Sequence, residues 1–261
     1  MPKVNFTING QPVTCEKDSM LLEVALANGF DIPALCYHQA EPPYGACRLC
    51  LVEITQGKWN WVEASCTYPV REDGIQVQTD SDKVRRYRRL NLELLLARCP
   101  ESEAVQQMAR DLGLGGARLP QDGTDQCIQC GLCVRVCRDL IGVGAIGFTG
   151  RGADRHVDTP YGEPSETCIG CGACAELCPT GHVHVVDDLE AMTRRIEPFH
   201  TEHRLVPCPQ CGRGYVSEKQ LEHLRQELGE KAAILECCAV CRSRSRALEL
   251  KSVYDAMTKT R

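Results

Sequence analysis

The chain has 261 residues, a formal net charge of −5, nineteen cysteines and few aromatic side chains. The acidic balance argues against a nucleic-acid-binding protein, which is normally basic. No stretch is apolar enough to form a transmembrane segment, and the first residues lack the charged and apolar regions of a signal peptide. Disulfide scaffolds are short and secreted, so we expect free thiols in a reducing, cytoplasmic compartment.

Residues 1–80 have the pattern of a small β-grasp domain. Apolar and polar residues alternate at 4–8 and again at 13–15, on either side of an Asn9-Gly10 turn. Ser19 is suited to cap a helix that runs through Asn28 and ends before Gly29. Strand-like alternation then recurs at 51–54, 59–64 and 75–79.

Four cysteines in this first domain form a candidate metal site. Cys36, Cys47, Cys50 and Cys66 are separated by ten, two and fifteen residues. Four thiolates suit a 2Fe–2S cluster, and the small residues Gly45 and Ala46 would let backbone amides approach the cluster sulfurs. The first gap is longer than the four residues of plant-type ferredoxins, so the match is not to that class. The alternative is a set of four buried structural cysteines.

Residues 81–119 are expected to form a helical connector. Apolar residues at helical spacing predict one helix over 82–97, which Pro100 terminates, and a second over 101–112. The expected apolar face of the first helix is Val84, Tyr87, Leu90, Leu94 and Leu95. Its basic residues form either a solvated face or a docking patch for an acidic partner; they are Lys83, Arg85, Arg86, Arg88 and Arg89.

Residues 120–186 contain two cysteine runs with the same spacing. The first is Cys127-x2-Cys130-x2-Cys133-x3-Cys137, and the second is Cys168-x2-Cys171-x2-Cys174-x3-Cys178, followed by Pro179. This spacing is typical of a ferredoxin with two 4Fe–4S clusters, in which the fourth cysteine of each run binds the other cluster. We therefore predict one cluster on Cys127, Cys130, Cys133 and Cys178, and another on Cys168, Cys171, Cys174 and Cys137. Zinc sites do not ordinarily show this spacing twice.

Residues 187–205 are expected to be a linker, and 206–261 a small zinc-ribbon-like domain with a tail. Two Cys-x2-Cys pairs lie on either side of a helix that begins with a capping box at Ser217 and ends at Gly229. The predicted zinc ligands are Cys208, Cys211, Cys238 and Cys241, with Cys237 as an alternative ligand. A further iron–sulfur cluster and a redox dithiol remain as alternatives. The fold class predicted for the whole chain is thus α+β.

The three cysteine sets, in this order, resemble a known family of electron-transfer modules. The module is similar to the N-terminal part of the large iron–sulfur subunit of complex I, and closer to the iron–sulfur diaphorase subunit of NAD-linked nickel–iron hydrogenases. Similar modules open iron-only hydrogenases and NAD-linked formate dehydrogenases. The resemblance covers residues 1–186 and is carried by Gly45-Ala-Cys-Arg-Leu-Cys50 with Cys36 and Cys66, the run from Cys127 to Cys137, Gly142-Val-Gly-Ala-Ile-Gly147, and the run from Cys168 to Pro179.

The chain departs from this family at two places. The family usually has a histidine and three cysteines for another 4Fe–4S cluster before the two-cluster unit, where this chain keeps only Cys99. We therefore expect that cluster to be absent. The C-terminal cysteine pairs are the second departure and suggest a docking element. No hydrogenase or molybdopterin domain is expected between the second cysteine run and Arg261.

The resemblance implies a non-catalytic electron-transfer subunit of an NAD(P)-linked oxidoreductase, with one 2Fe–2S cluster, two 4Fe–4S clusters and one zinc. Implied partners are a flavin-containing NAD(P)H-oxidising subunit, a small thioredoxin-like 2Fe–2S subunit, a hydrogenase or formate dehydrogenase subunit and, in electron-bifurcating complexes, ferredoxin. No nucleotide-binding fingerprint is present, so NAD and flavin are expected on partners. The alternatives are a free ferredoxin-like carrier and, in a different class, a redox-sensing regulator, which the acidic composition disfavours.

Overall fold

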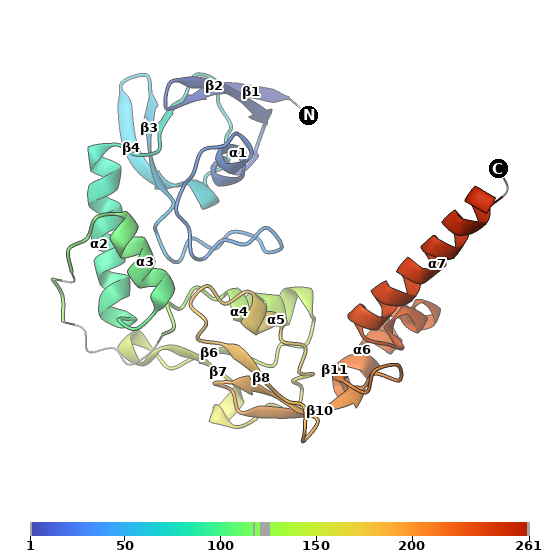
Figure 1. Cartoon of the computed structure of the whole chain (residues 1–261). Helices are drawn as coiled ribbons and strands as arrows, with labels where there is room; N and C mark the ends of the chain where they lie inside the picture. The colour runs from blue at the N-terminus through green and yellow to red at the C-terminus, as the bar shows by residue number, and fades with distance from the viewer. Residues whose placement is uncertain (1, 117, 121–125, 260–261) are drawn as a thin grey trace.

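The structure is a computed structural model that describes residues 2–116, 118–120 and 126–259, and side chains as far as residue 251. An N-terminal sheet, a pair of helices, a two-cluster region and a C-terminal arm follow one another along the chain (Figure 1). Residues 121–125, at the start of the expected two-cluster domain, lie outside the described residues. No described helix is long and apolar enough to cross a membrane.

The N-terminal unit is a five-stranded sheet with the order β2-β1-β5-β3-β4. Its strands are β1 (Lys3–Ile8), β2 (Gln11–Glu16), β3 (Leu51–Gln56), β4 (Trp59–Ala64) and β5 (Gln76–Gln78). β1 and β5 are parallel, and the other neighbours are antiparallel. Helix α1 (Leu21–Ala27) buries Leu21 and Leu22 against the inward side chains of the strands, among them Ile8 and Ile54. The predicted strands and helix are therefore present in the predicted order.

The start of α1 differs from the prediction. Met20 occupies the N-cap position and no side chain caps this helix. Ser19 lies one residue earlier, and its carbonyl oxygen instead accepts a hydrogen bond from the amide of Val70 at 2.9 Å. Backbone pairing of Ser19 with Val70 thus places the start of the helix one residue later than predicted.

The connector contains α2 (Asp82–Arg98) and α3 (Glu103–Asp111). Ser81 caps α2 by accepting a hydrogen bond from the Val84 amide. The predicted apolar face of α2 is wrong in part. Val84 is buried and Leu95 packs against a buried cluster, as expected, whereas Tyr87, Leu90 and Leu94 are exposed. The helix also buries Arg88, Leu92, Glu93 and Leu96. Arg88 is not part of a solvated face, because its Nη2 donates to the carbonyl oxygen of Leu51 at 2.6 Å inside the protein.

The two-cluster region is built from short elements. These are α4 (Leu132–Arg135), the π-helical turn Val136–Leu140, the hairpin of β6 (Gly147–Thr149) and β7 (His156–Asp158), and α5 (Ala173–Glu176), with single 3-10 turns at Gly152–Asp154 and Pro160–Gly162. Gly131 and Gly172 precede α4 and α5 with positive φ values of 71° and 76°. The repeated Cys-x2-Cys-Gly sequence therefore repeats as a structure, with a left-handed residue before each short helix.

The segment 187–205, expected as a linker, belongs to strands. A four-stranded sheet with the order β11-β10-β9-β8 contains β8 (His184–Asp188), β9 (Thr193–Glu197), β10 (Thr201–Pro207) and β11 (Gly214–Ser217). Ile196, Phe199 and Leu205 are buried, whereas the charged residues Glu202 and Arg204 are exposed. Because of these charged residues, the short alternation of apolar and polar residues is difficult to recognise in the sequence.

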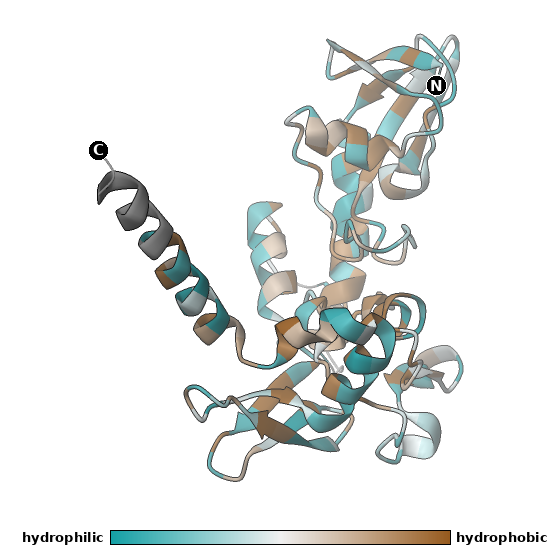
Figure 2. Cartoon of the chain, turned by 90° about the vertical axis from the view of Figure 1, so that its right-hand side faces the viewer, coloured by the Kyte–Doolittle hydropathy of each residue, from teal (hydrophilic) through white to brown (hydrophobic). Residues whose placement is uncertain are grey.

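The C-terminal part consists of α6 (Glu218–Leu228), a 3-10 segment (Gly229–Leu235) and α7 (Ala239–Lys259). The predicted cap is confirmed, because Ser217 Oγ accepts a hydrogen bond from the Gln220 amide at 3.1 Å and the helix ends at Gly229. Figure 2 shows that α7 extends away from the rest of the chain as an arm.

Candidate metal centres

The four cysteines of the N-terminal unit converge between its loops. Cys36 and Cys47 lie in the long loop after α1, Cys50 directly precedes β3, and Cys66 lies in the 3-10 turn Ser65–Thr67 after β4. None of the four is more than 3% exposed. The Cys47 amide donates to Cys36 Sγ at 3.4 Å. This hydrogen bond joins the later part of the loop to its first part.

The turn that carries Cys66 is held against Cys50. Both the amide and the hydroxyl of Ser65 donate to the carbonyl oxygen of Cys50, at 2.9 and 2.8 Å. Gly45 adopts a φ of 74°, and a Cβ there would lie 3.2 Å from Thr67 Cγ2. Glycine, which lacks a Cβ, is therefore favoured where the loop meets this turn.

The thiols of this set are coupled in pairs. Hydrogen bonding with Cys36 lowers the pKa of Cys47 to about 6, and hydrogen bonding with Cys66 lowers the pKa of Cys50 to about 7. The same contacts raise the pKa of Cys36 and that of Cys66. These contacts favour the thiolate form of Cys47 and Cys50, and thiolates are the form that binds metal.

The set Cys127, Cys130, Cys133 and Cys178 lines one cavity, together with apolar residues such as Val157 and Val183. Two backbone amides donate to its sulfurs at 3.4 Å, from Gln129 to Cys127 and from Val183 to Cys178. Thr180 Oγ1 lies 3.6 Å from Cys178 Sγ. The fold therefore brings the last cysteine of the second run to the first three of the first run.

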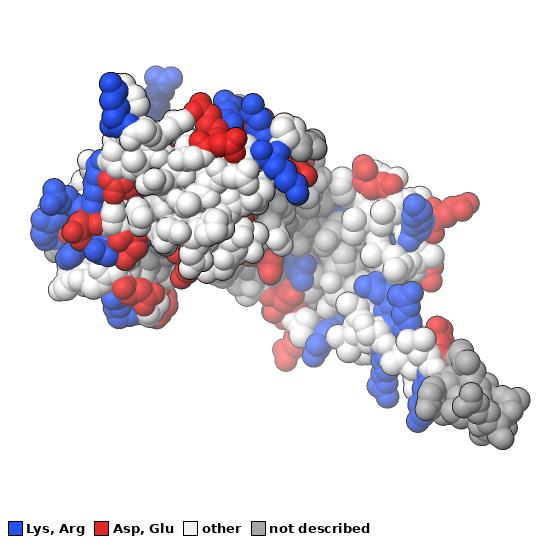
Figure 3. Space-filling view, turned by 90° about the horizontal axis from the view of Figure 1, so that it is seen from above, with Lys and Arg blue, Asp and Glu red and all other residues white. Residues whose placement is uncertain are grey.

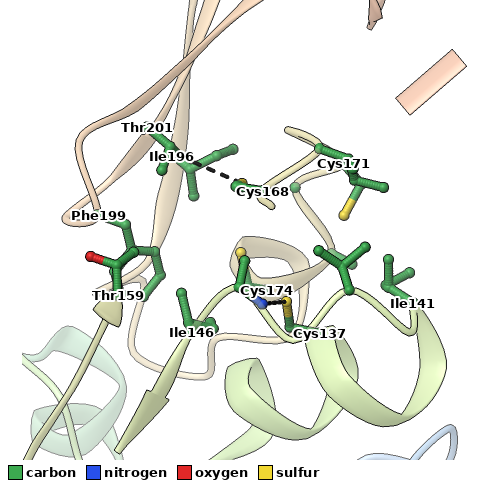
Figure 4. Close-up of a pocket in the computed structure, with 15 residues that line it drawn as sticks. Cys137, Ile141, Ile146, Thr159, Cys168, Cys171, Cys174, Ile196, Phe199 and Thr201 are labelled. Atoms are coloured by element: carbon green, nitrogen blue, oxygen red, sulfur yellow. Dashed lines mark hydrogen bonds between the residues drawn. The ribbon is translucent and has the colours of Figure 1, made fainter. Parts of the chain in front are cut away.

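The complementary set Cys137, Cys168, Cys171 and Cys174 lines a second cavity, shown in Figure 4. The amide of Ala145 donates to Cys137 Sγ at 3.3 Å, and Thr201 Oγ1 lies 3.6 Å from Cys168 Sγ. Apolar side chains close the remaining wall, among them Ile146, Ile196 and Phe199. Each cavity thus gathers three cysteines of one run and the fourth cysteine of the other run.

Without a nearby positive charge, the negatively charged thiolate form of the cysteines is unfavourable in these two cavities. Burial raises the pKa of Cys130 to about 11 and that of Cys174 to about 12, and burial followed by neighbouring thiols raises the pKa of Cys133. Buried charge is costly without a compensating partner, and iron ions would supply it. Four converging sulfurs, amide donors to sulfur and apolar walls fit a 4Fe–4S cluster in each cavity.

The three sets adjoin one another. Cys36 and Cys47 belong to the same buried cluster as Cys130, with Leu35 and Leu132 beside them. Cys133 belongs to the same set as Cys130. It lies close enough to Cys174, in the second cavity, for the Cys174 thiol to contribute to the raised pKa of Cys133. The cysteine sets therefore form a continuous series from the N-terminal unit to the second cavity.

The C-terminal cysteines form a fourth group. The sulfurs of Cys208, Cys211, Cys238 and Cys241 all lie within 4.8 Å of one another. The Cys238 amide donates to Cys208 Sγ at 3.4 Å and lowers the pKa of Cys208 to about 6. Hydrogen bonding to Cys238 raises the pKa of Cys241 to about 12. Cys237 lies outside this group of four.

Three cysteines lie outside all four groups, namely Cys15, Cys99 and Cys237. Cys15 is half-buried on β2, and Cys99 is fully buried among apolar residues that include Leu96 and Val105. The sequence analysis did not identify two threonines beside the cavities, Thr180 and Thr201. Thr180 lies two residues after Cys178, whereas Thr201 is 33 residues away from Cys168 and approaches it only through the tertiary fold.

Comparisons with known proteins agree with this arrangement. Residues 1–82 match the 2Fe-2S iron-sulfur cluster binding domain, and residues 126–182 match the 4Fe-4S dicluster domain. The chain is 35% identical over 204 residues to the alpha subunit of an NADPH-Fe(3+) oxidoreductase of Geobacter sulfurreducens, which covers 68% of this chain and 24% of that protein. It is 30% identical over 237 residues to one subunit of an NADH-quinone oxidoreductase of Rhizobium meliloti, covering 81% of this chain and 27% of that protein.

The chain thus spans about a quarter of the length of these curated relatives. A solved structure of an NAD+-reducing NiFe hydrogenase in the H2-reduced state is also similar, with 30% identity and a TM-score of 0.53, over 60% of this chain and 74% of that one. The resemblance predicted from the cysteine pattern is therefore confirmed. The chain belongs to the family of iron–sulfur electron-transfer subunits of NAD(P)-linked oxidoreductases, similar to modules of complex I and of NAD+-reducing hydrogenase.

Proposed function

We propose that this chain relays electrons between a flavin-containing NAD(P)H-oxidising subunit and a hydrogenase subunit, within a cytoplasmic complex. The observation that carries this proposal is the series of adjoining cysteine sets, in which Cys47 neighbours Cys130 and Cys133 neighbours Cys174. Short separations between redox centres favour fast electron transfer. Cysteines that bind metal must stay reduced, which supports the cytoplasm as the compartment.

We assign a 2Fe–2S cluster to Cys36, Cys47, Cys50 and Cys66. One 4Fe–4S cluster, the first cubane, belongs to Cys127, Cys130, Cys133 and Cys178, and the other, the second cubane, to Cys137, Cys168, Cys171 and Cys174. The role of the chain is to hold these groups, exclude water and set their reduction potentials through hydrogen bonds to sulfur. The residues that carry these hydrogen bonds include Ala145, Val183 and Thr201.

We assign a structural zinc ion to Cys208, Cys211, Cys238 and Cys241. Zinc–sulfur bonds of about 2.3 Å in a tetrahedron place the sulfurs about 3.8 Å apart. The distance from Cys211 Sγ to Cys238 Sγ is 3.8 Å, which supports a single ion. A cubane would hold its thiolates farther apart, because iron and sulfide occupy the space between them.

Metal analysis of the anaerobically purified complex tests these assignments. About ten irons and one zinc per copy of this chain are expected, after partner clusters are subtracted. Cys211→Ser should lose the zinc and keep the irons, whereas Cys171→Ser should lose irons and keep the zinc. About fourteen irons without zinc would contradict the zinc assignment.

The same preparation identifies the partner. Nickel in the complex is expected for a hydrogenase, and molybdenum or tungsten would replace this proposal with a formate dehydrogenase. Recovery of the chain alone, fully loaded and reducible by a small carrier, would favour the free ferredoxin-like carrier.

A further inference from the structure

We infer that the groove between the second cubane site and the C-terminal arm is a docking site for an acidic electron-carrier protein. The inference rests on the proposed function, since it gives a partner to the cluster assigned to Cys137, Cys168, Cys171 and Cys174. The groove encloses about 810 Å³ and is lined by residues of the C-terminal cysteine group, α6 and the start of α7.

The charge of this groove is opposite to that of the chain. Its lining contains four arginines, Arg194, Arg213, Arg242 and Arg244, and no aspartate or glutamate among the described residues, although the whole chain has a net charge of −5. The Arg194 guanidinium is paired with Asp187, at 2.7 and 2.9 Å, so the positive charge that a partner would meet belongs mainly to the other three. Figure 3 shows basic side chains along the arm that α7 forms.

A cluster ligand lies at one edge of the groove. Cys171 lines both the second cubane cavity and the groove, so this edge separates the proposed cluster from a bound partner by little more than one side chain. Arg194 Nη1 donates to the carbonyl oxygen of Gly170 at 3.3 Å and holds the loop that carries Cys171. A carrier protein bound in the groove would place its own redox centre near the proposed cluster. This proximity favours electron transfer, so it points to a redox partner.

The surface is also suited to a protein rather than a small anion. Leu224, Leu235 and Val240 contribute apolar area between the arginines, and Val240 is 72% exposed. Protein interfaces combine an apolar centre with arginines at higher frequency than the remaining surface. Opposite charge on a partner would steer its approach and fix its orientation. The reaction is a one-electron exchange between the carrier and the cluster beside Cys171, with no bond formed or broken.

Binding of a plant-type 2Fe–2S ferredoxin, a small acidic carrier, to the full cluster-loaded chain tests the inference. Isothermal titration calorimetry at low salt should detect a complex that weakens as salt rises, since exposed charges are screened. The charge-reversal variant Arg213→Glu/Arg244→Glu should weaken the Kd by about tenfold or more. Lys3→Glu/Lys58→Glu changes the net charge equally in the N-terminal unit and should leave the Kd within about twofold of wild type.

Each other outcome overturns the inference. Equal binding of basic cytochrome c, or a Kd that the arginine substitutions leave unchanged, would show that the groove does not select an acidic carrier. Self-association or binding of a DNA duplex that depends on Arg213 and Arg244, without ferredoxin binding, would assign the groove to another occupant. A chain with its expected irons that does not bind ferredoxin overturns the docking site alone, whereas a chain that takes up no second cubane overturns the proposed function with it.

Discussion

The guanidinium of Arg135 joins the two halves of the cluster-binding region through Glu41. Arg135 Nη1 lies 3.6 Å from Glu41 Oε2 and donates to the carbonyl oxygen of Pro42 at 2.5 Å. The two side chains are 11% and 1% exposed, and Arg135 also lies over the ring of Tyr44. A buried ion pair thus connects the loop of the N-terminal unit to the helix that carries Cys133.

Arg135→Met should destabilise the protein by about 3 kcal/mol, because it leaves the Glu41 carboxylate buried without its partner. The thermal unfolding midpoint of the anaerobic, cluster-loaded chain measures this change. The double variant Arg135→Met/Glu41→Gln should recover part of the loss, since no charge then remains buried. Identical midpoints for the single variant and the wild type would contradict a structural role for the pair.

Gly170→Ala should disrupt the second cubane site. Gly170 has a φ of 66°, and a Cβ there would lie 2.6 Å from His203 Cδ2. The imidazole is buried, so it has little room to move. The expected result is loss of about four irons per chain, measured by iron analysis, with the first cubane retained.

Gly113→Ala is the matched control for Gly170→Ala. Gly113 has a φ of 64°, but a Cβ there would meet no atom within 4 Å. This variant should show only the cost of the left-handed backbone, about 1 kcal/mol, with all irons retained. Equal iron loss in both variants would mean that backbone strain, and not the contact with His203, damages the site.

Thr201→Val should lower the reduction potential of the second cubane. A thiolate ligand has no proton, so the hydroxyl of Thr201 must donate to Cys168 Sγ, and this bond stabilises the more negative reduced cluster. A loss on the order of 30 mV is expected, which is about 0.7 kcal/mol for one electron. Redox titration followed by electron paramagnetic resonance measures the potential.

Thr180→Val provides the comparison for the first cubane, because Thr180 Oγ1 lies 3.6 Å from Cys178 Sγ. Each substitution should shift one potential and leave the other nearly unchanged. If both substitutions shifted the same cluster, the crossed assignment of the fourth cysteines would be wrong.

Cys99→Ala should leave the iron content at about ten per chain. Cys99 is buried with Leu92, Leu96 and Val105, so apolar side chains occupy its surroundings. The substitution should cost about 1 kcal/mol through the loss of buried sulfur contacts. Loss of four irons in this variant would reveal a further cluster that the sequence does not predict, and Cys130→Ala serves as the positive control for iron loss.

The sequence predicted most of the local structure of the N-terminal unit, but it misplaced part of the buried face of α2. Tyr87, Leu90 and Leu94 have helical spacing, yet the chain buries Arg88 and Glu93 instead. Arg88 reaches the carbonyl oxygen of Leu51, and Glu93 binds Arg118 through two hydrogen bonds at 2.6 and 2.8 Å. Hydropathy carries no information on such partners, because they are supplied by distant parts of the chain.

The sequence by itself determined which cysteines belong together, because metal ligands at fixed short spacings depend on local geometry that the chain carries with it. The tertiary structure alone decided what surrounds them: the strands made from the expected linker, the hydroxyl of Thr201 beside Cys168, and the ion pair of Arg135 with Glu41. These features join residues that are distant in sequence, and their pairing follows from how the folded units pack. The grouping of the cysteines therefore follows from their spacing in the sequence, whereas the contacts that Thr201 and Arg135 make with distant residues arise only from the fold.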